Sequence, residues 1–271
     1  MDRPIGVIDS GVGGMTVVKE LMRQLPKESI YYIGDTKRCP YGPRPAEEVR
    51  TFTWEMVEHL KRYEIKMLVV ACNTATAFTL EELREKLTIP VLGVIEPGAR
   101  AAISTSENKR IGVIGTEGTI GSESYPQALK AIDASIRVNS QACPALVPLV
   151  ERGVLAGYEA HAIVRTELQP LKNKNGIDTL ILGCTHYPLI KGVIQQEIGG
   201  AVKVISSGEE TAREASLILS YNDLLVQSEQ EPSYRFYTTG DFDNFKMIAT
   251  EWFEGPLDTF EVIELDPVSI Y

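Results

Sequence analysis

Short apolar runs alternate along the chain with segments whose apolar residues recur at helical spacing. The strand-sized runs are Ile5–Asp9, Ile30–Gly34, Met67–Ala71, Val91–Ile95, Arg110–Gly115, Thr179–Gly183 and Val202–Ile205. The helical segments are Thr16–Leu25, Pro45–Tyr63 and Thr76–Leu87. Apolar strands that alternate with helices are typical of parallel sheets covered on both faces. The pattern therefore predicts an α/β fold.

Two pairs of motifs repeat between the halves of the chain. Gly6-Val-Ile-Asp-Ser-Gly11 is echoed by Gly112-Val-Ile-Gly-Thr-Glu-Gly118, and Leu68-Val-Val-Ala-Cys-Asn-Thr-Ala75 by Leu180-Ile-Leu-Gly-Cys-Thr-His-Tyr187. Cys72 lies 66 positions after Gly6, and Cys184 lies 72 positions after Gly112. We interpret the repeat as a duplication that produced two similar parallel-sheet domains related by a pseudo-twofold axis.

The polar stretch Gln227–Ser233 is interpreted as a linker to a C-terminal tail. The tail has the pattern of a strand, a helix and a strand: Tyr234–Tyr237, Asn244–Phe253 and Phe260–Leu265. We expect it to pack back on the first half, so residues 1–97 and 209–271 form one domain and residues 98–208 the other. Open parallel sheets bind ligands at the carboxyl ends of their strands. We therefore expect the active site in the cleft between the domains.

Charge and composition exclude several classes of protein. With 27 Lys and Arg against 37 Asp and Glu, the net charge is -10, and no local basic patch opposes it. This argues against nucleic acid and anionic membrane surfaces as partners. The apolar runs are far too short to span a bilayer, and the N-terminus lacks the pattern of a secretory signal. We expect a cytoplasmic protein without a membrane partner.

The four cysteines, at positions 39, 72, 143 and 184, form no C-x-x-C motif. We therefore predict no metal site and, in a reducing compartment, free thiols. Cys72 and Cys184 each follow a strand in the duplicated context, whereas Cys39 and Cys143 lack that context and are expected to be structural. The duplication thus places one candidate reactive thiol in each domain.

Two thiols in mirror-related positions suit the inversion of an amino acid at its α-carbon. The reaction needs a base on one face and an acid on the other, and only the thiolate is an effective base. Asp9 could adjust the pKa of Cys72, and His186 that of Cys184, with Glu151 as a partner of His186. Asp9 could instead cap a helix, and Glu151 could be a solvated helix residue.

Polar groups follow several of the predicted strands. Ser10-Gly11-Val-Gly-Gly14 opens a helix, so its backbone N–H groups could bind an anion. Its glycines do not fit the G-x-G-x-x-G dinucleotide motif, and no lysine is marked for a pyridoxal phosphate Schiff base. Asn73-Thr74 and Thr185-His186 offer further donors at predicted helix starts. His59 and His161 have no partner at motif spacing and are expected to be ordinary histidines.

Four motifs resemble those of the glutamate racemase family, which is cofactor-independent. They are Gly6-Val-Ile-Asp-Ser-Gly-Val-Gly-Gly14, Gly34-Asp-Thr-Lys-Arg-Cys-Pro-Tyr-Gly42, Val70-Ala-Cys-Asn-Thr-Ala75 and Leu182-Gly-Cys-Thr-His-Tyr-Pro188. The resemblance implies racemisation of glutamate that supplies D-glutamate for peptidoglycan, without a cofactor, in a homodimer. It implies Cys72 as the base toward D-glutamate and Cys184 as the base toward L-glutamate. The implied substrate contacts are Asp9, Ser10, Tyr41, Gly42, Asn73, Thr74, Thr185 and His186.

Other functions remain open at this point. The same fold and thiols could racemise aspartate or another amino acid. A two-lobed protein could also bind an amino acid without catalysis, although two retained thiols argue against that. A cysteine hydrolase could use Cys184 and His186 but would leave Cys72 idle.

Overall fold

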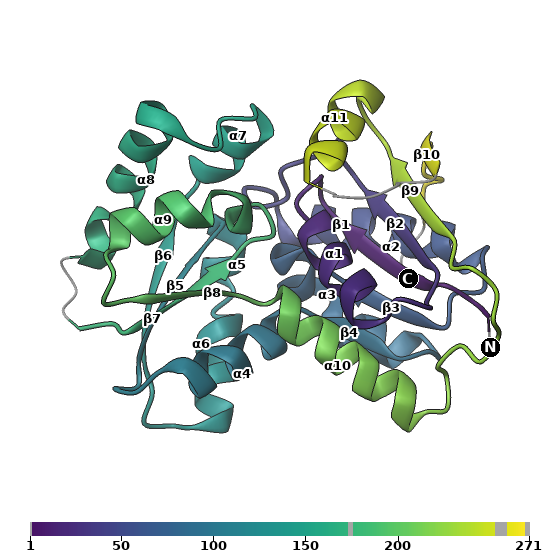
Figure 1. Cartoon of the computed structure of the whole chain (residues 1–271), viewed down its shortest axis with the longest axis horizontal. Coiled ribbons are helices and arrows are strands. Elements are labelled where there is room, and N and C mark those ends of the chain that lie inside the picture. The colour runs from purple at the N-terminus through teal and green to yellow at the C-terminus, as the bar shows by residue number, and fades with distance from the viewer. Residues whose placement is uncertain (1, 173–175, 253–258, 269–271) are drawn as a thin grey trace.

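The computed structural model describes residues 2–172, 176–252 and 259–268. They form two lobes, each built on its own parallel sheet (Figure 1). The sheet of the first lobe has the strand order β10 (Thr259–Val262), β9 (Tyr234–Thr238), β2 (Ile30–Gly34), β1 (Ile5–Asp9), β3 (Met67–Val70) and β4 (Val91–Gly93). The sheet of the second lobe has the order β6 (Arg137–Ala142), β5 (Arg110–Gly115), β7 (Thr179–Gly183) and β8 (Lys203–Ser206). The predicted α/β fold with two parallel-sheet domains is confirmed.

The two sheets share one strand order. The series β2-β1-β3-β4 corresponds to β6-β5-β7-β8, as expected of a duplication. A packing detail repeats as well: a Cβ added to Gly6 would lie 2.8 Å from Ile65 Cδ1, and one added to Gly112 would lie 2.9 Å from Ile177 Cδ1. Because each glycine has no side chain, an isoleucine from the turn before the third strand of the lobe can pack directly against its backbone.

Helices cover both faces of each sheet. Around the first sheet lie α1 (Met15–Gln24), α2 (Ala46–Lys61), α3 (Asn73–Lys86), α10 (Gly208–Tyr221) and α11 (Phe242–Trp252). Around the second lie α4 (Ile95–Thr105), α5 (Glu117–Gly121), α6 (Ser124–Ile132), α7 (Leu146–Glu151), α8 (Gly157–Lys172), the 3₁₀ turn η1 (Tyr187–Ile190) and α9 (Lys191–Ile198). The first sheet has an apolar core on each face, and successive residues of a strand point to opposite faces. Val7 packs with α1 and α10 on one face, and Ile8 packs with α2 and α3 on the other. No helix in the described part of the chain is long and apolar enough to cross a membrane.

The C-terminal tail extends the first sheet, as predicted. β9 pairs with β2, and β10 pairs with β9, both in parallel. Phe236 of β9 is fully buried, and its ring lies 5.2 Å from that of Phe260. The predicted boundaries at 97/98 and 208/209 fall in the first turns of α4 and α10. The assignment of residues to two domains at those points stays a prediction.

Several predicted bounds differ from the structure. The strand expected over Val91–Ile95 ends at Gly93 because α4 begins at Ile95, and β8 is shifted by one residue. α3 begins at Asn73 rather than Thr76, β10 ends at Val262, and Phe253 lies outside the described residues. β6 was not predicted, because it is a polar edge strand with no fully buried residue. Such a strand lacks the apolar run on which the prediction depends.

A pair of leucines on α10 tests the packing of this helix on the first lobe. Leu219 is fully buried in the core that α10 shares with α1, whereas Leu217 is 71% exposed. We expect Leu219→Ala to lower the free energy of unfolding by about 2 to 5 kcal/mol through the cavity it leaves. Leu217→Ala should change it by less than about 0.5 kcal/mol. Urea unfolding followed by circular dichroism measures both, and equal losses would contradict this packing.

Candidate active site

The lobes meet around a small cavity at the carboxyl ends of their strands. Residues of both lobes line it: Ser10, Pro40, Tyr41, Gly42, Cys72, Asn73, Thr74, Thr116, Val147, Cys184, Thr185 and His186. The free volume is only about 10 Å³. The structure thus brings both predicted thiols and seven of the eight predicted substrate contacts to one cavity, with Asp9 directly behind it. Pro40, Thr116 and Val147 were not predicted, although the repeat pairs Thr116 with Ser10.

Cys72 is held at the start of α3 in the first lobe. Its sulfur accepts a hydrogen bond from the Ala75 backbone N–H at 3.4 Å and lies 3.6 Å from Ser10 Oγ. Burial and the nearby Asp9 carboxylate raise the pKa of the Cys72 thiol to about 12. Cys72 is therefore protonated near pH 7 in the substrate-free site.

Cys184 lies in the equivalent place of the second lobe, beside a histidine. Its sulfur is 3.7 Å from His186 Nδ1, and His186 Nε2 lies 2.5 Å from Glu151 Oε1. Burial alone would lower the pKa of His186, but hydrogen bonds with Cys184, Cys39 and Glu151 raise it well above its usual value. For Glu151 the directions are reversed: burial would raise its pKa, but the hydrogen bond to His186 and the charge of His186 hold it below the usual value. An imidazolium–carboxylate pair thus stands behind Cys184.

Asp9 ends β1 and joins the two lobes. Its Oδ1 accepts from the backbone N–H groups of Gly11 and Gly14, and its Oδ2 accepts from Thr185 Oγ1, each at 3.0 Å. Burial raises the pKa of Asp9, and the positive charge of His186 and these hydrogen bonds oppose the rise. Asp9 therefore makes the contacts of a cap and also lies close enough to influence Cys72.

Hydroxyl and amide groups form the rest of the polar wall. Thr74 Oγ1 lies 2.8 Å from Thr116 Oγ1, which joins the lobes at a second point. Tyr125 donates a hydrogen bond of 2.8 Å to Asn73 Oδ1 and so orients that amide. Asn73, Thr74 and Thr116 thus present neutral donors and acceptors to the cavity.

Two cysteines were expected to be structural and two histidines to be ordinary, and all but one of these four residues lie away from the cavity. Cys143 is fully buried in the core of the second lobe, as predicted, and His161 pairs with Glu197 at 2.9 Å near the surface. His59 packs against the ring of Tyr237. Cys39 is only partly buried, and its sulfur lies 3.8 Å from Glu151 Oε1. Cys39 therefore borders the site, and its position two residues before Tyr41 in one of the four motifs was the signal for it.

Cys39, Glu151 and His186 are the described residues whose side-chain grouping could hold a metal ion. The 2.5 Å between His186 Nε2 and Glu151 Oε1 is a hydrogen-bond distance. Two ligand atoms about 2.1 Å from a tetrahedral zinc ion would stand roughly 3.4 Å apart. Burial also raises the pKa of Cys39 to about 11, so its thiol is protonated near pH 7. The geometry fits a hydrogen-bonded group better than a ligand set.

A family model described as Asp/Glu/Hydantoin racemase matches residues 5–215, which include both sheets apart from the tail strands. The chain belongs to the Asp/Glu/hydantoin racemase family. The expectation of a racemase, an isomerase, is confirmed by this membership. The matched segment carries Cys72 and Cys184 with all their polar neighbours described above.

Similar members of the racemase family cover nearly the whole chain. Glutamate racemase from Oceanobacillus iheyensis is 61% identical over 94% of this chain and 93% of that protein. The crystal structure of a glutamate racemase isoform from Bacillus anthracis has a TM-score of 0.92 and 52% identity over 97% of both chains. Glutamate racemase from Francisella tularensis, crystallised with D-glutamate, has a TM-score of 0.90 and 34% identity over 98% of both chains.

The charge state of His186 can be tested by titration. We expect its imidazole to stay protonated at pH values where an unpartnered imidazole, with a pKa of about 6.5, has lost its proton. Glu151→Gln removes a negative charge that favours the protonated form, so the pKa of His186 should fall. Nitrogen-15 NMR of the histidine side chains measures both. His59, whose pKa burial lowers, is the internal control and should not move.

Proposed function

We propose that this chain interconverts L- and D-glutamate without a cofactor, using Cys72 and Cys184 as the two acid/base groups. The observation that carries the proposal is that one cavity holds one thiol from each lobe, at equivalent ends of β3 and β7. A substrate between the lobes would have one thiol on each face of its α-carbon. The names of the similar proteins, and the D-glutamate complex of the Francisella tularensis protein, support glutamate as the substrate.

The charges around the thiols fit a reaction that begins with L-glutamate. Cys184, as a thiolate beside the His186 imidazolium, would remove the α-proton. Cys72, which its pKa of about 12 keeps as a thiol, would donate its proton to the opposite face of the carbanion. The reverse reaction needs Cys72 as the thiolate. The ammonium group of the substrate would favour that form by adding a positive charge to the closed site.

Uncharged groups would hold the two carboxylates of the substrate. No lysine or arginine is among the described residues that line the cavity. The hydroxyls of Ser10, Thr74 and Thr185, the Asn73 amide and the backbone of Tyr41 and Gly42 are the proposed partners of the two carboxylates. The Asp9 carboxylate, directly behind Thr185, is the proposed partner of the ammonium group.

Entry of glutamate requires the lobes to separate. A cavity of about 10 Å³ has room for no more than one water molecule. Closure of the lobes around the substrate would then exclude water and strengthen the interactions that stabilise the carbanion.

From the resemblance to glutamate racemases, we also propose that the product supplies peptidoglycan synthesis in the cytoplasm and that the chain is a homodimer. Light scattering of the purified protein tests the dimer.

The function is tested by incubating purified protein with L-glutamate in deuterium oxide, with no added cofactor. We expect loss of the circular dichroism signal of the substrate and replacement of the Cα proton by deuterium. Exchange in neither enantiomer would refute the proposal. Faster turnover of L-aspartate than of L-glutamate would leave the mechanism standing but assign a different substrate.

The two-thiol mechanism predicts the effect of single substitutions. Cys72→Ala and Cys184→Ala should each lower the rate of racemisation by at least about a thousandfold, because each removes one proton-transfer group. Both should still bind glutamate in calorimetry. Cys143→Ala, which alters a buried thiol away from the cavity, is the matched control and should retain activity within about twofold. Full turnover by either cavity variant would exclude the mechanism.

A further inference from the structure

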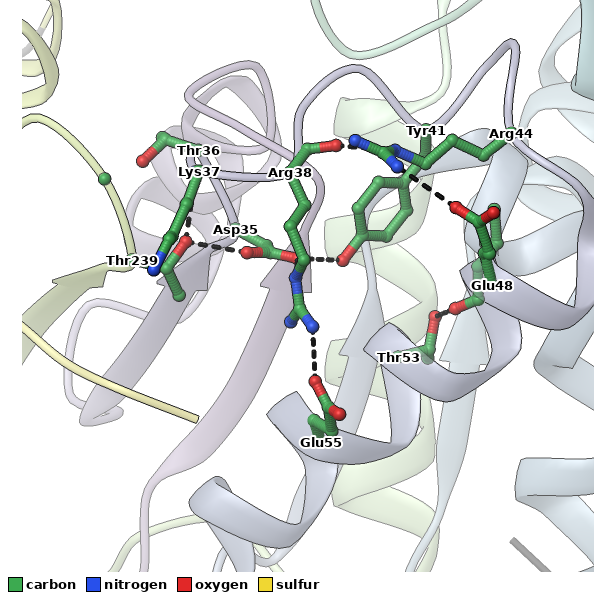
Figure 2. Close-up of polar contacts among 12 residues, drawn as sticks. Asp35, Thr36, Lys37, Arg38, Tyr41, Arg44, Glu48, Thr53, Glu55 and Thr239 are labelled. Atoms are coloured by element: carbon green, nitrogen blue, oxygen red, sulfur yellow. Dashed lines mark hydrogen bonds and ion pairs between the residues drawn. The ribbon is translucent and has the colours of Figure 1, made fainter. Parts of the chain in front are cut away.

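A buried carboxylate outside the cavity holds one of its walls. Asp35 directly follows β2, and its side chain is fully buried. Its Oδ2 accepts hydrogen bonds from the Tyr41 phenol at 2.5 Å and from Arg38 Nε at 2.6 Å (Figure 2). A buried charge is tolerated only with such partners. Asp35 thus fixes the fold of the loop that leads to Tyr41.

The second oxygen of Asp35 is held by the C-terminal tail. Thr239 directly follows β9 and donates from Oγ1 to Asp35 Oδ1 at 2.6 Å (Figure 2). The same hydroxyl accepts from the Lys37 backbone N–H at 3.1 Å. Thr239 and Asp35 are 204 positions apart in the sequence. One side chain of the tail therefore reaches the carboxylate that holds Tyr41.

Arg38 supports the same carboxylate from the side of α2. Its guanidinium pairs with Glu55 and lies 3.9 Å from the centre of the Phe52 ring. Arg38 is thus fixed by two residues of α2, while Thr239 approaches Asp35 from the tail. Without the Thr239 hydroxyl, the side-chain donors to Asp35 in the described part of the chain would be Arg38 and Tyr41.

The loop that Asp35 holds ends in the cavity wall. Tyr41 and Gly42 line the cavity, and Tyr41 is only 1% exposed. The Gly42 carbonyl accepts from the Gly118 N–H of the second lobe at 2.9 Å, and a Cβ on Gly42 would lie 2.5 Å from Thr116 Cβ. Small shifts of this loop would therefore change both the wall and the contact between the lobes.

We propose that Thr239 is a positioning residue for racemisation, which acts through the Asp35 carboxylate to hold Tyr41 in the cavity wall. The inference rests on the proposed function, since Tyr41 contacts the substrate only if this cavity binds glutamate. Loss of the Thr239 hydroxyl deprives one oxygen of a buried carboxylate of a donor. The Asp35 carboxylate then shifts toward its other donor, Arg38, and its hydrogen bond to Tyr41 is weakened. Tyr41 is held less firmly in the cavity wall, so the substrate is bound less tightly.

Thr239→Val is the decisive variant, because it removes the hydroxyl and keeps the shape. We expect KM for L-glutamate to rise by about tenfold, with kcat within about twofold of the wild type. The separate variant Thr239→Ser, which retains the hydroxyl, should have the KM of the wild type. Thr238→Val is the matched control: Thr238 Oγ1 lies 2.6 Å from Thr36 Oγ1, so it joins the same two segments without contacting Asp35. Its KM should equal that of the wild type.

The split between KM and kcat separates positioning from stability. A merely structural role would reduce the fraction of active enzyme, which lowers the apparent kcat and leaves KM unchanged. Both Thr239 and Tyr41 act through Asp35. The KM of the double variant Thr239→Val/Tyr41→Phe should therefore be no higher than the KM of whichever single variant has the larger value. If Thr239→Val does not fold, Thr239→Ala is measured instead and should likewise have a raised KM with a nearly unchanged kcat.

Two results would overturn the inference: an unchanged KM in Thr239→Val, or an equal rise in Thr238→Val. Absence of glutamate turnover by the wild-type chain in the same assay would instead overturn the proposed function. The two failures are therefore distinguishable in one set of measurements.

Discussion

The burial of one carboxylate constrains much of the molecule. Asp9 is fully buried, and it accepts hydrogen bonds from the turn before α1 and from Thr185 of the other lobe. A charge without these donors would be costly at this depth. The requirement fixes the path of the chain after β1, brings the segment between β7 and η1 against the first lobe and places a negative charge near Cys72. The hydrogen bonds of this one group therefore connect the first lobe to the second directly behind the cavity.

The sequence predicted the elements whose signal is local and apolar. β1, β2, β5 and β7 have the predicted bounds because each is a short apolar run in which all residues, or all but one, are buried. β6 lacks such a run. Thr116 was not predicted, although it occupies the position of the repeat that corresponds to Ser10. The pairing of Glu151 with His186, proposed from residue chemistry, agrees with their 2.5 Å contact. Thr239 could not have been predicted, because its importance depends on a contact across 204 positions that no local pattern encodes.

The duplicated lobes share a backbone plan but differ in the groups beside their thiols. The first lobe has Asp9 at the end of its first strand, and the second has Gly115 in the corresponding place. Two positions after each cysteine stand Thr74 in the first lobe and His186 in the second. Negative charge thus lies near Cys72, and an imidazolium lies beside Cys184. The pseudo-symmetry supplies the geometry, and its local departures distinguish the two thiols.

The presence of both lobes in one chain has an evolutionary consequence. In a dimer of identical half-length chains, any substitution beside one thiol would appear beside the other as well. Such a dimer could not place a carboxylate near one sulfur and an imidazolium near its counterpart. With both lobes in one chain that restriction is absent, so the surroundings of each thiol can be changed by substitutions in its own half.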